Sequence, residues 1–221
     1  MNPERWPTVR PEALVLAKAP VPGHAKTRLC PPLSLDQAAM VAEAALIDTL
    51  VAVSASAFTR RTLVLDGAPG PWLVPGFRVV PQVGRGLDVR LAEAFRVARG
   101  PALLVGMDTP QVDPALLDQA GQLLGSSGVD AVLGPAEDGG WWIIGLRRPD
   151  PRVFIGVPMS SRTTGVAQRH RLEQLGLRCV QLPTLRDVDR FEDGLAVARL
   201  APGTRFARVF GQAVHGTLVR T

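Results

Sequence analysis

Apolar residues are arranged along the chain in short unbroken runs that alternate with longer stretches of helical periodicity. An unbroken apolar run of this kind is typical of a strand that is buried within a sheet. Strands are therefore expected at residues 13–18, 62–67, 77–82, 101–108, 129–136, 141–146 and 177–183.

The stretches between these runs carry helix start signals. Ser34 precedes an alanine-rich stretch and is followed three residues later by Gln37, which is the spacing of a capping box. Asp113 stands directly before Pro114, as an N-cap residue stands before a proline at the first helical position. Helices are expected at residues 34–54, 84–100, 113–125, 162–175 and 187–200, with a further helix of unknown role within residues 204–221.

The alternation of strands and helices predicts an α/β fold with a mostly parallel sheet flanked by helices. The four residues EDGG, which join the fifth and sixth expected strands, are too few for a parallel crossover. One antiparallel strand is therefore expected there. No repeat, low-complexity tract or linker interrupts the pattern, so residues 1–221 are expected to form a single domain.

Composition and charge narrow the classes of function. Hydrophobic residues make up 46% of the chain and charged residues 20%, which is ordinary for a soluble globular protein. The net charge is +5, but the basic residues are spread along the chain, so nucleic-acid binding is not expected. We find no apolar run near the length of a membrane span, and residues 1–13 lack the apolar core of a secretory signal. These features predict a cytoplasmic protein without a membrane span.

Cysteine and histidine usage argues against a disulfide framework or a zinc site. The two cysteines, Cys30 and Cys179, lie far apart in the sequence. An intracellular setting would keep them reduced. The three histidines are scattered and form no short-spaced pair of zinc ligands.

The loop AKAPVPGHAKTRL, at residues 17–29, contains both lysines of the chain. It follows the first expected strand, where ligands bind in sheets of this class. It fits neither the Walker loop nor the G-x-G-x-x-G fingerprint. Lysine ammonium groups and backbone amides suit a pyrophosphate, and Lys26 is expected to be exposed. The residues proposed to bind nucleotide phosphates here are Lys18, Pro20, Gly23, Lys26 and Arg28. The alternative is an ordinary basic surface turn.

Asp108 is the first acidic position of interest, because it ends an expected buried strand. A carboxylate at that edge can reach a divalent metal that bridges nucleotide phosphates, and Mg²⁺ and Mn²⁺ favour such oxygen ligands. The alternative is that Asp108 caps a turn before Pro110.

Four segments resemble a bacterial family of glycosyltransferase-A-like proteins: AKAPVPGHAKTRL, GMDTPQV, GPAEDGGWWIIGL and LPTLRDVDRFEDG. Many members are known only as a domain of unknown function, and some are glycosyltransferases of arsenosugar biosynthesis. The resemblance extends over residues 13–198 and implies kinship with phospholactate guanylyltransferase and the molybdopterin nucleotidyltransferases. It implies the nucleotide-diphospho-sugar transferase (GT-A) fold, a three-layer Rossmann-like arrangement around a mixed sheet.

The resemblance also implies a metal site that holds Mg²⁺ or Mn²⁺. Asp108 matches one metal-binding position, although Pro110 stands where glycosyltransferases often have the second Asp of Asp-x-Asp. Asp189 matches a second metal-binding carboxylate of the related nucleotidyltransferases, with Asp187 as the runner-up. The alternative for Asp189 is a cap on the last helix.

The EDGG segment supplies the candidate catalytic residues, Glu137 and Asp138, which would bind the sugar or act as a base. Gly139 and Gly140 would let a ligand approach the backbone, or would simply form a hairpin turn. Trp141 is a candidate for stacking on a ring, and core packing is the alternative. Other candidates are Arg90, for phosphate or for a surface ion pair, and Asp88, Ser161 and Thr163 for substrate contacts.

These observations leave three functions open. The leading hypothesis is glycosyl transfer from a nucleotide-sugar to a small-molecule acceptor, assisted by a metal at Asp108. The rival is a nucleotidyltransferase that uses the same loop to bind an NTP and transfers NMP to a phosphorylated small molecule. The third is a non-catalytic nucleotide-binding protein. A fold alone does not choose among them, and the sequence leaves the oligomeric state open.

Overall fold

The computed structural model describes residues 10–218 of the chain. Every strand and helix predicted from the apolar pattern is present, with ends that differ by a few residues. The elements are β1 (Glu12–Lys18), α1 (Leu35–Ala55), β2 (Arg61–Asp66), β3 (Arg78–Pro81), α2 (Leu87–Arg96), β4 (Ala102–Gly106), α3 (Pro114–Gly125), β5 (Ala131–Pro135), β6 (Trp141–Leu146), α4 (Thr164–Gln174), β7 (Cys179–Gln181), α5 (Phe191–Leu200) and α6 (Arg205–Leu218). Short 3₁₀ turns η2 (Thr27–Leu29) and η3 (Pro151–Val153) lie between them.

The predicted start signals act as expected. The Ser34 hydroxyl accepts a hydrogen bond from the Gln37 backbone, and the Gln37 side chain accepts one from the Ser34 backbone. Asp113 caps α3 by accepting from the Leu116 backbone at 2.7 Å, with Pro114 as the first helical residue. These caps fix the entry of the two helices that pack on one face of the sheet.

The seven strands form one sheet in the order β3-β2-β1-β4-β6-β5-β7. Strand β6 runs antiparallel to both of its neighbours, β4 and β5, and the other pairings are parallel. The predicted antiparallel strand is therefore confirmed as β6. Because the remaining strands run in one direction, the loops that follow them meet at one carboxyl edge.

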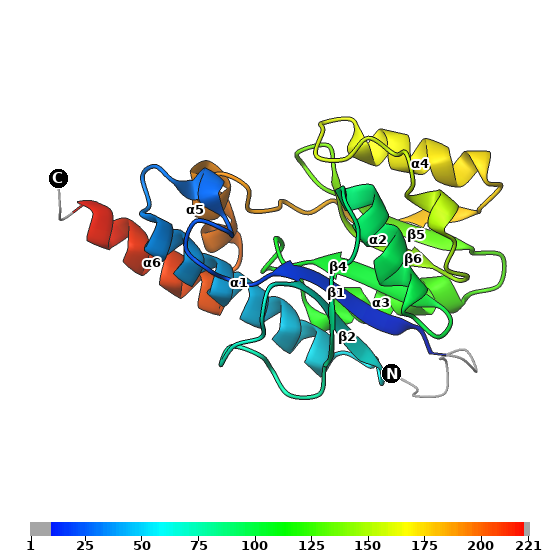
Figure 1. Ribbon diagram of the computed structural model, residues 1–221, viewed down its shortest axis with the longest axis horizontal. Helices are drawn as coiled ribbons and strands as arrows, with labels where there is room; N and C mark the ends of the chain where they lie inside the picture. Colours follow the sequence, from blue (N-terminus) through cyan, green and yellow to red (C-terminus); the bar gives the residue numbers. More distant parts are fainter. Residues whose placement is uncertain (1–9, 219–221) are drawn as a thin grey trace.

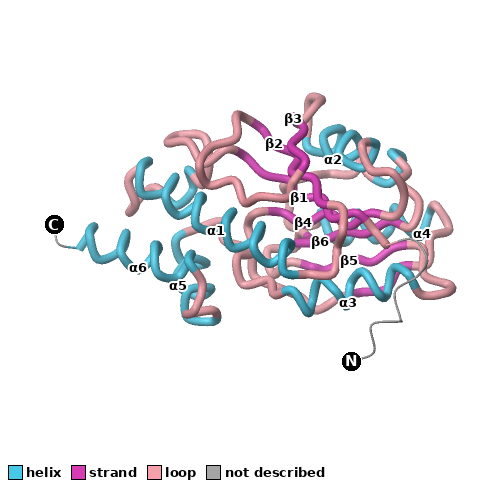
Figure 2. Tube along the Cα trace, turned by 90° about the horizontal axis from the view of Figure 1, so that it is seen from below, coloured by secondary structure: helices cyan, strands magenta, loops and turns pink. Residues whose placement is uncertain are grey.

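Helices cover both faces of the sheet, which gives the expected three layers (Figures 1 and 2). Apolar side chains of α1 and α3 fill one interface, including Leu46, Leu50 and Leu117. Those of α2 and α4 fill the other, including Phe95 and Leu172. This is the three-layer α/β arrangement around a mixed sheet that the resemblance implies.

A third apolar cluster joins α1 to α5 and α6, beside the sheet (Figure 1). Val41 and Ala45 of α1 contribute to it together with Phe206 and Phe210 of α6. Helix α1 is thus buried on two sides. Within the described residues it is the one helix whose length and apolar composition would suffice to cross a membrane, and 61% of its most apolar window is buried inside the protein.

The expectation about a secretory signal concerns residues 1–13, and residues 1–9 lie outside the described part of the chain. The cytoplasmic location remains a prediction from the sequence.

Candidate active site

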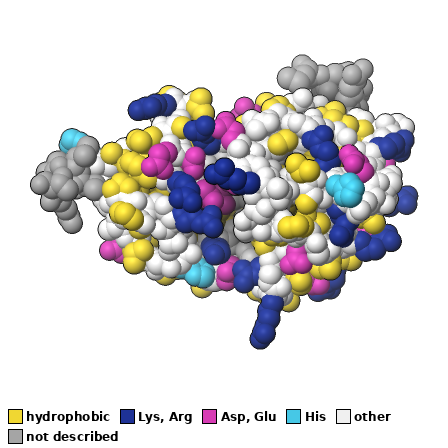
Figure 3. Space-filling model, turned by 90° about the horizontal axis from the view of Figure 1, so that it is seen from above, with side chains coloured by type: hydrophobic (Ala, Val, Ile, Leu, Met, Phe, Trp, Pro, Cys, Tyr) yellow, Lys and Arg dark blue, Asp and Glu magenta, His cyan; other side chains and the backbone are white. Residues whose placement is uncertain are grey.

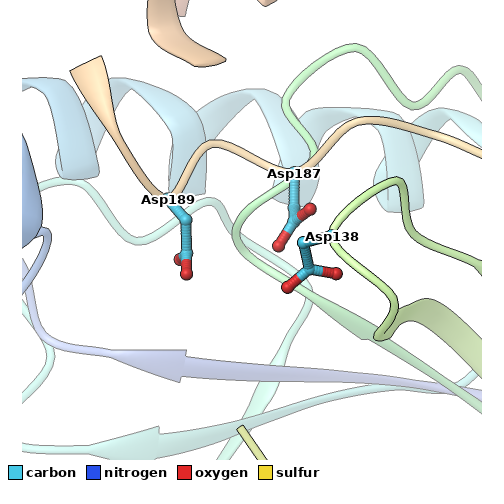
Figure 4. Close-up of side chains that lie close together, drawn as sticks. All are labelled: Asp138, Asp187 and Asp189. Carbon is cyan, nitrogen blue, oxygen red and sulfur yellow. The ribbon is translucent and has the colours of Figure 1, made fainter. Parts of the chain in front are cut away.

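Three carboxylates gather at the carboxyl edge of the sheet. Asp138 lies in the turn between β5 and β6, and Asp187 and Asp189 lie in the segment between β7 and α5. Each offers an oxygen atom that lies within 4.8 Å of those of the other two, and Asp187 extends toward Asp138 (Figure 4). A set of oxygen donors this close together fits a hard divalent cation such as Mg²⁺ or Mn²⁺.

Asp187 has a raised pKa within this cluster. Burial raises its pKa to about 7, and the negative charges of Asp138, Asp189 and Asp108 add to the rise, whereas its own backbone N–H group opposes it. The raised pKa thus reflects first the burial of this carboxyl group and then the neighbouring negative charges.

The turn that carries Asp138 is held by its own backbone. The Gly140 N–H group donates to Asp138 Oδ1 at 2.7 Å, which leaves Oδ2 for other contacts. Gly139 has a φ of +92°, and a Cβ atom there would lie 2.0 Å from the Arg162 carbonyl oxygen. The close approach expected at Gly139 is therefore made by the protein's own backbone at Arg162 and at the start of α4, where the Gly165 N–H group donates to the Gly139 carbonyl at 2.8 Å.

Asp108 follows β4, as expected, but a lysine already contacts it. The Lys26 ammonium group donates to the Asp108 carboxylate and to the Val188 carbonyl oxygen. The Lys26 side chain is only 6% exposed, whereas that of Asp108 is 47% exposed. The expectation that Lys26 would be exposed is wrong, because its ammonium group is taken up by Asp108 and Val188, two residues from distant parts of the chain.

The other candidate residues of the opening loop lie at or near the protein surface. Arg28 donates to Asp189 Oδ2 at 2.7 Å, and both side chains are substantially exposed. Lys18 is exposed at the end of β1 and makes no ion pair with any described residue. Gly23 is exposed with a φ of +76°, and Pro20 is half-buried. Acidic and basic side chains meet where the surface is hollowed between the two halves of the molecule (Figure 3).

Arg90 and Asp88, at the start of α2, contact other parts of the protein. Arg90 donates to Asp66 Oδ2 at 3.1 Å and, more weakly, to the Gln82 side chain. Asp88 accepts from the Gly156 backbone at 3.2 Å, which ties α2 to the turn after η3. The ion-pair alternative for Arg90 is thus what the structure shows.

Glu137 forms an ion pair, although it is a candidate catalytic residue. Its Oε2 atom accepts from Arg186 Nε at 2.6 Å and lies 2.5 Å from Arg186 Nη2. Trp142 is buried in the core on the α1 side, and its indole N–H donates to the Pro183 carbonyl at 2.9 Å. Trp141 packs, partly buried, against the cluster on the α2 side.

Ser161 and Thr163 form the turn that begins α4. Their hydroxyl groups lie 2.8 Å apart, and the Thr163 N–H group donates to Ser161 Oγ at 3.1 Å. They lie next to the Asp138 turn through the contact between Arg162 and Gly139. Their role in substrate contact remains a prediction.

The sequence also contains a local signal for the Asp187–Asp189 pair. In an extended segment, residues two apart lie on one side and the residue between them on the other. Val188, between the two aspartates, is fully buried in the cluster with α5 and α6, while both carboxylates turn to the site. The apolar residue in the sequence Asp-Val-Asp thus marks two carboxylates that belong together. Arg186 was missed as a partner of Glu137.

The sequence of this chain matches a known protein family. Residues 37–161 match the family described as an uncharacterized protein conserved in bacteria (DUF2064). The chain belongs to this family. The match to the DUF2064 family includes Asp108 and Asp138, whereas the opening loop and the segment with Asp187 and Asp189 lie outside it.

Solved structures share the fold. A protein from Desulfovibrio desulfuricans G20, provisionally named a nucleotide-diphospho-sugar transferase, is 26% identical with a TM-score of 0.79, and the alignment covers 95% of this chain and 96% of that one. A CMP:2-keto-3-deoxy-manno-octonic acid synthetase complexed with CTP is 11% identical with a TM-score of 0.56, over 88% and 99% of the two chains. The 2-C-methyl-D-erythritol 4-phosphate cytidylyltransferase from Thermus thermophilus is 13% identical with a TM-score of 0.55, over 88% and 100%.

A search of curated proteins found no match. The similarity to the solved structures shows that this chain has the fold of transferases that use nucleotides, and it supports the interpretation that the protein is an enzyme.

Proposed function

We propose that the protein is a metal-assisted glycosyltransferase that uses a nucleotide-sugar donor. The observation that carries the proposal is the cluster of Asp138, Asp187 and Asp189. Within the described residues, no cationic side chain pairs with Asp138 or Asp187. A negative cluster that the protein leaves unbalanced at the ligand-binding edge of its sheet is suited to a divalent cation.

The three carboxylates, joined by Asp108 at the same edge of the sheet, would hold Mg²⁺ or Mn²⁺, which would offset the negative charge that develops on a leaving nucleotide diphosphate. Lys18 is exposed beside this region and would contact the phosphates, together with Arg28 once it leaves Asp189. Because Asp138 Oδ1 is held by the Gly140 backbone, its Oδ2 atom would be the one that contacts the metal, beside the transferred sugar or the acceptor.

Glycosyl transfer is preferred because a solved protein that is 26% identical over 95% of this chain is provisionally named a nucleotide-diphospho-sugar transferase. Nucleotidyl transfer is the second candidate. The observation that favours it is Pro110, which takes the place of the second aspartate of the Asp-x-Asp motif. In that reaction an NTP would release pyrophosphate as a phosphorylated acceptor receives the NMP group.

The two candidates are separated by a ligand screen followed by a turnover assay. Nucleotide-sugars and NTPs are each tested by thermal shift with Mg²⁺, Mn²⁺ or EDTA. Ligands that stabilise the protein are then incubated with it, and donor consumption is followed by mass spectrometry. We expect metal-dependent stabilisation and consumption of a nucleotide-sugar by the wild type, with a severe loss in Asp187→Asn.

Pyrophosphate release from an NTP without consumption of any nucleotide-sugar would replace the proposal by nucleotidyl transfer. Binding that is the same in EDTA as in Mn²⁺ would remove the metal from the proposal altogether.

A further inference from the structure

The two lysines of the chain share one loop but differ in environment. Lys18 is exposed at the end of β1. The Lys26 side chain is almost fully buried and lies against the acidic residues at the carboxyl edge. A lysine held inside a site contributes its charge at a fixed place, whereas an exposed one is largely screened by solvent.

Lys26 joins three segments that are distant in sequence. Its ammonium group, carried by the loop after β1, donates to the carboxylate that follows β4 and to the carbonyl of Val188. The Val188 N–H group in turn donates to the Asp108 carbonyl oxygen at 2.8 Å. The ammonium group therefore lies where Asp108 and the segment between Asp187 and Asp189 meet.

This position is also where a divalent cation would be attracted. The Asp108 carboxylate follows β4 at the same carboxyl edge of the sheet as the cluster of Asp138, Asp187 and Asp189. The Asp108 side chain is half-exposed, so its carboxylate is accessible from solvent although Lys26 contacts it. An ammonium group and a divalent cation repel each other, so both cannot contact the same carboxylate at close range without a large electrostatic cost.

We infer that Lys26 is a tethered counter-ion that a divalent metal must displace from Asp108, and that it then turns to the phosphates of the nucleotide. The inference rests on the proposed function and adds to it an order of events at the site. Without ligands, the Lys26 ammonium group occupies the place at Asp108 where the metal would bind. Metal and nucleotide bind together more tightly than either alone, because the nucleotide supplies a new partner for the displaced ammonium group.

The inference predicts that the protein binds metal more tightly when the positive charge of Lys26 is removed, but not when that of Lys18 is removed. Mn²⁺ binding to the nucleotide-free protein is measured by the electron paramagnetic resonance of free Mn²⁺ in wild type, Lys26→Met and Lys18→Met. Both substitutions remove one positive charge from the same loop. We expect Lys26→Met to bind Mn²⁺ about tenfold more tightly than Lys18→Met.

A second pair of variants tests whether the gain acts through Asp108. In an Asp108→Asn background, Lys26→Met should bring no gain in Mn²⁺ affinity. Circular dichroism of each variant verifies that it is folded. Equal Mn²⁺ affinity in Lys26→Met and Lys18→Met would overturn the inference while leaving the proposed function in place. Failure of every variant and of the wild type to bind Mn²⁺ would overturn both.

The presence of only two lysines allows a test without any substitution. The wild type is briefly treated with acetic anhydride, and the acetylation of Lys26 relative to Lys18 is read by mass spectrometry. Lys26 should be protected in EDTA and should become several-fold more reactive when Mn²⁺ alone is added. Protection of Lys26 that persists at saturating Mn²⁺ would show that the metal binds without displacing it, which overturns the inference.

Discussion

The acidic site has a paired side and an unpaired side. On the paired side each carboxylate has a cationic partner: Lys26 for Asp108, Arg28 for Asp189 and Arg186 for Glu137. On the unpaired side, Asp138 and Asp187 have no such partner among the described residues, and Asp187 has a strongly raised pKa. The comparison teaches that a ligand must displace a cation from the paired carboxylates, whereas the unpaired ones have no cation to lose and are suited to accept one from solution.

The sharpest test of this difference replaces one carboxylate on each side. Asp187→Asn should weaken metal-dependent nucleotide binding on the order of 100-fold, about 2.7 kcal/mol, because it replaces a carboxylate of the cluster with a neutral amide, which is a weaker ligand for a divalent cation. Glu137→Gln is the matched control and should change the affinity by less than about threefold. Calorimetric titration with nucleotide in Mn²⁺ and in EDTA gives both values. Equal losses in the two variants would erase the distinction between the sides.

A second test concerns the stability supplied by the paired side. Lys26→Met leaves the buried Val188 carbonyl without its side-chain donor, so the free energy of unfolding should fall by about 1–3 kcal/mol. Lys18→Met removes an exposed lysine and should change it by less than about 0.5 kcal/mol. Urea unfolding in EDTA measures both. A destabilisation by Lys18→Met as large as that by Lys26→Met would contradict the assignment of Lys26 to a structural contact.

The unpaired side should make stability depend on pH. The pKa of Asp187 is about 7 in the folded protein and lies near 4 in an unfolded chain, so the folded state keeps a proton that the unfolded state releases. Stability in EDTA is therefore expected to decrease as pH rises between about 4 and 7, and to level off above that range. Asp187→Asn should lack this decrease and should exceed the wild type in melting temperature at pH 8 more than at pH 5. Parallel curves for the two proteins would show that Asp187 titrates normally.

The smallest effect is expected from the exposed ion pair between Arg28 and Asp189. Because both side chains are in contact with solvent, Arg28→Ala should lower the free energy of unfolding by about 0–1 kcal/mol. The destabilisation caused by Arg28→Ala should become smaller in high salt, whereas that caused by Lys26→Met should change less. Thermal melts at two salt concentrations distinguish these cases.

The fold was predictable because its signals are local. Unbroken apolar runs, the Ser34 capping box and the short EDGG connection each act within a few residues, and the structure confirms what they predict. The edge of the sheet that carries the site follows from the strand directions. Asp108 and Asp138 could be placed there for that reason alone.

The details of the site depend on contacts between distant segments, which periodicity does not show. The burial of Lys26 arises from Asp108 and Val188, and its partners lie more than eighty residues away in the chain. Gly139 is required by the backbone at Arg162, which a turn signal cannot reveal. The roles of the three clustered carboxylates stay predictions that the experiments above address.

The position of α1 between two apolar clusters has a consequence for how the chain is made. The helix is complete at Ala55, but the helix that covers Val41 and Ala45 begins only at Arg205. At ordinary rates of translation the interval is roughly ten seconds. During this time a long apolar helix has one side without its final cover, so it is a natural binding surface for chaperones. A chain that ends before α5 would keep that surface exposed permanently and should be prone to aggregation and proteolysis.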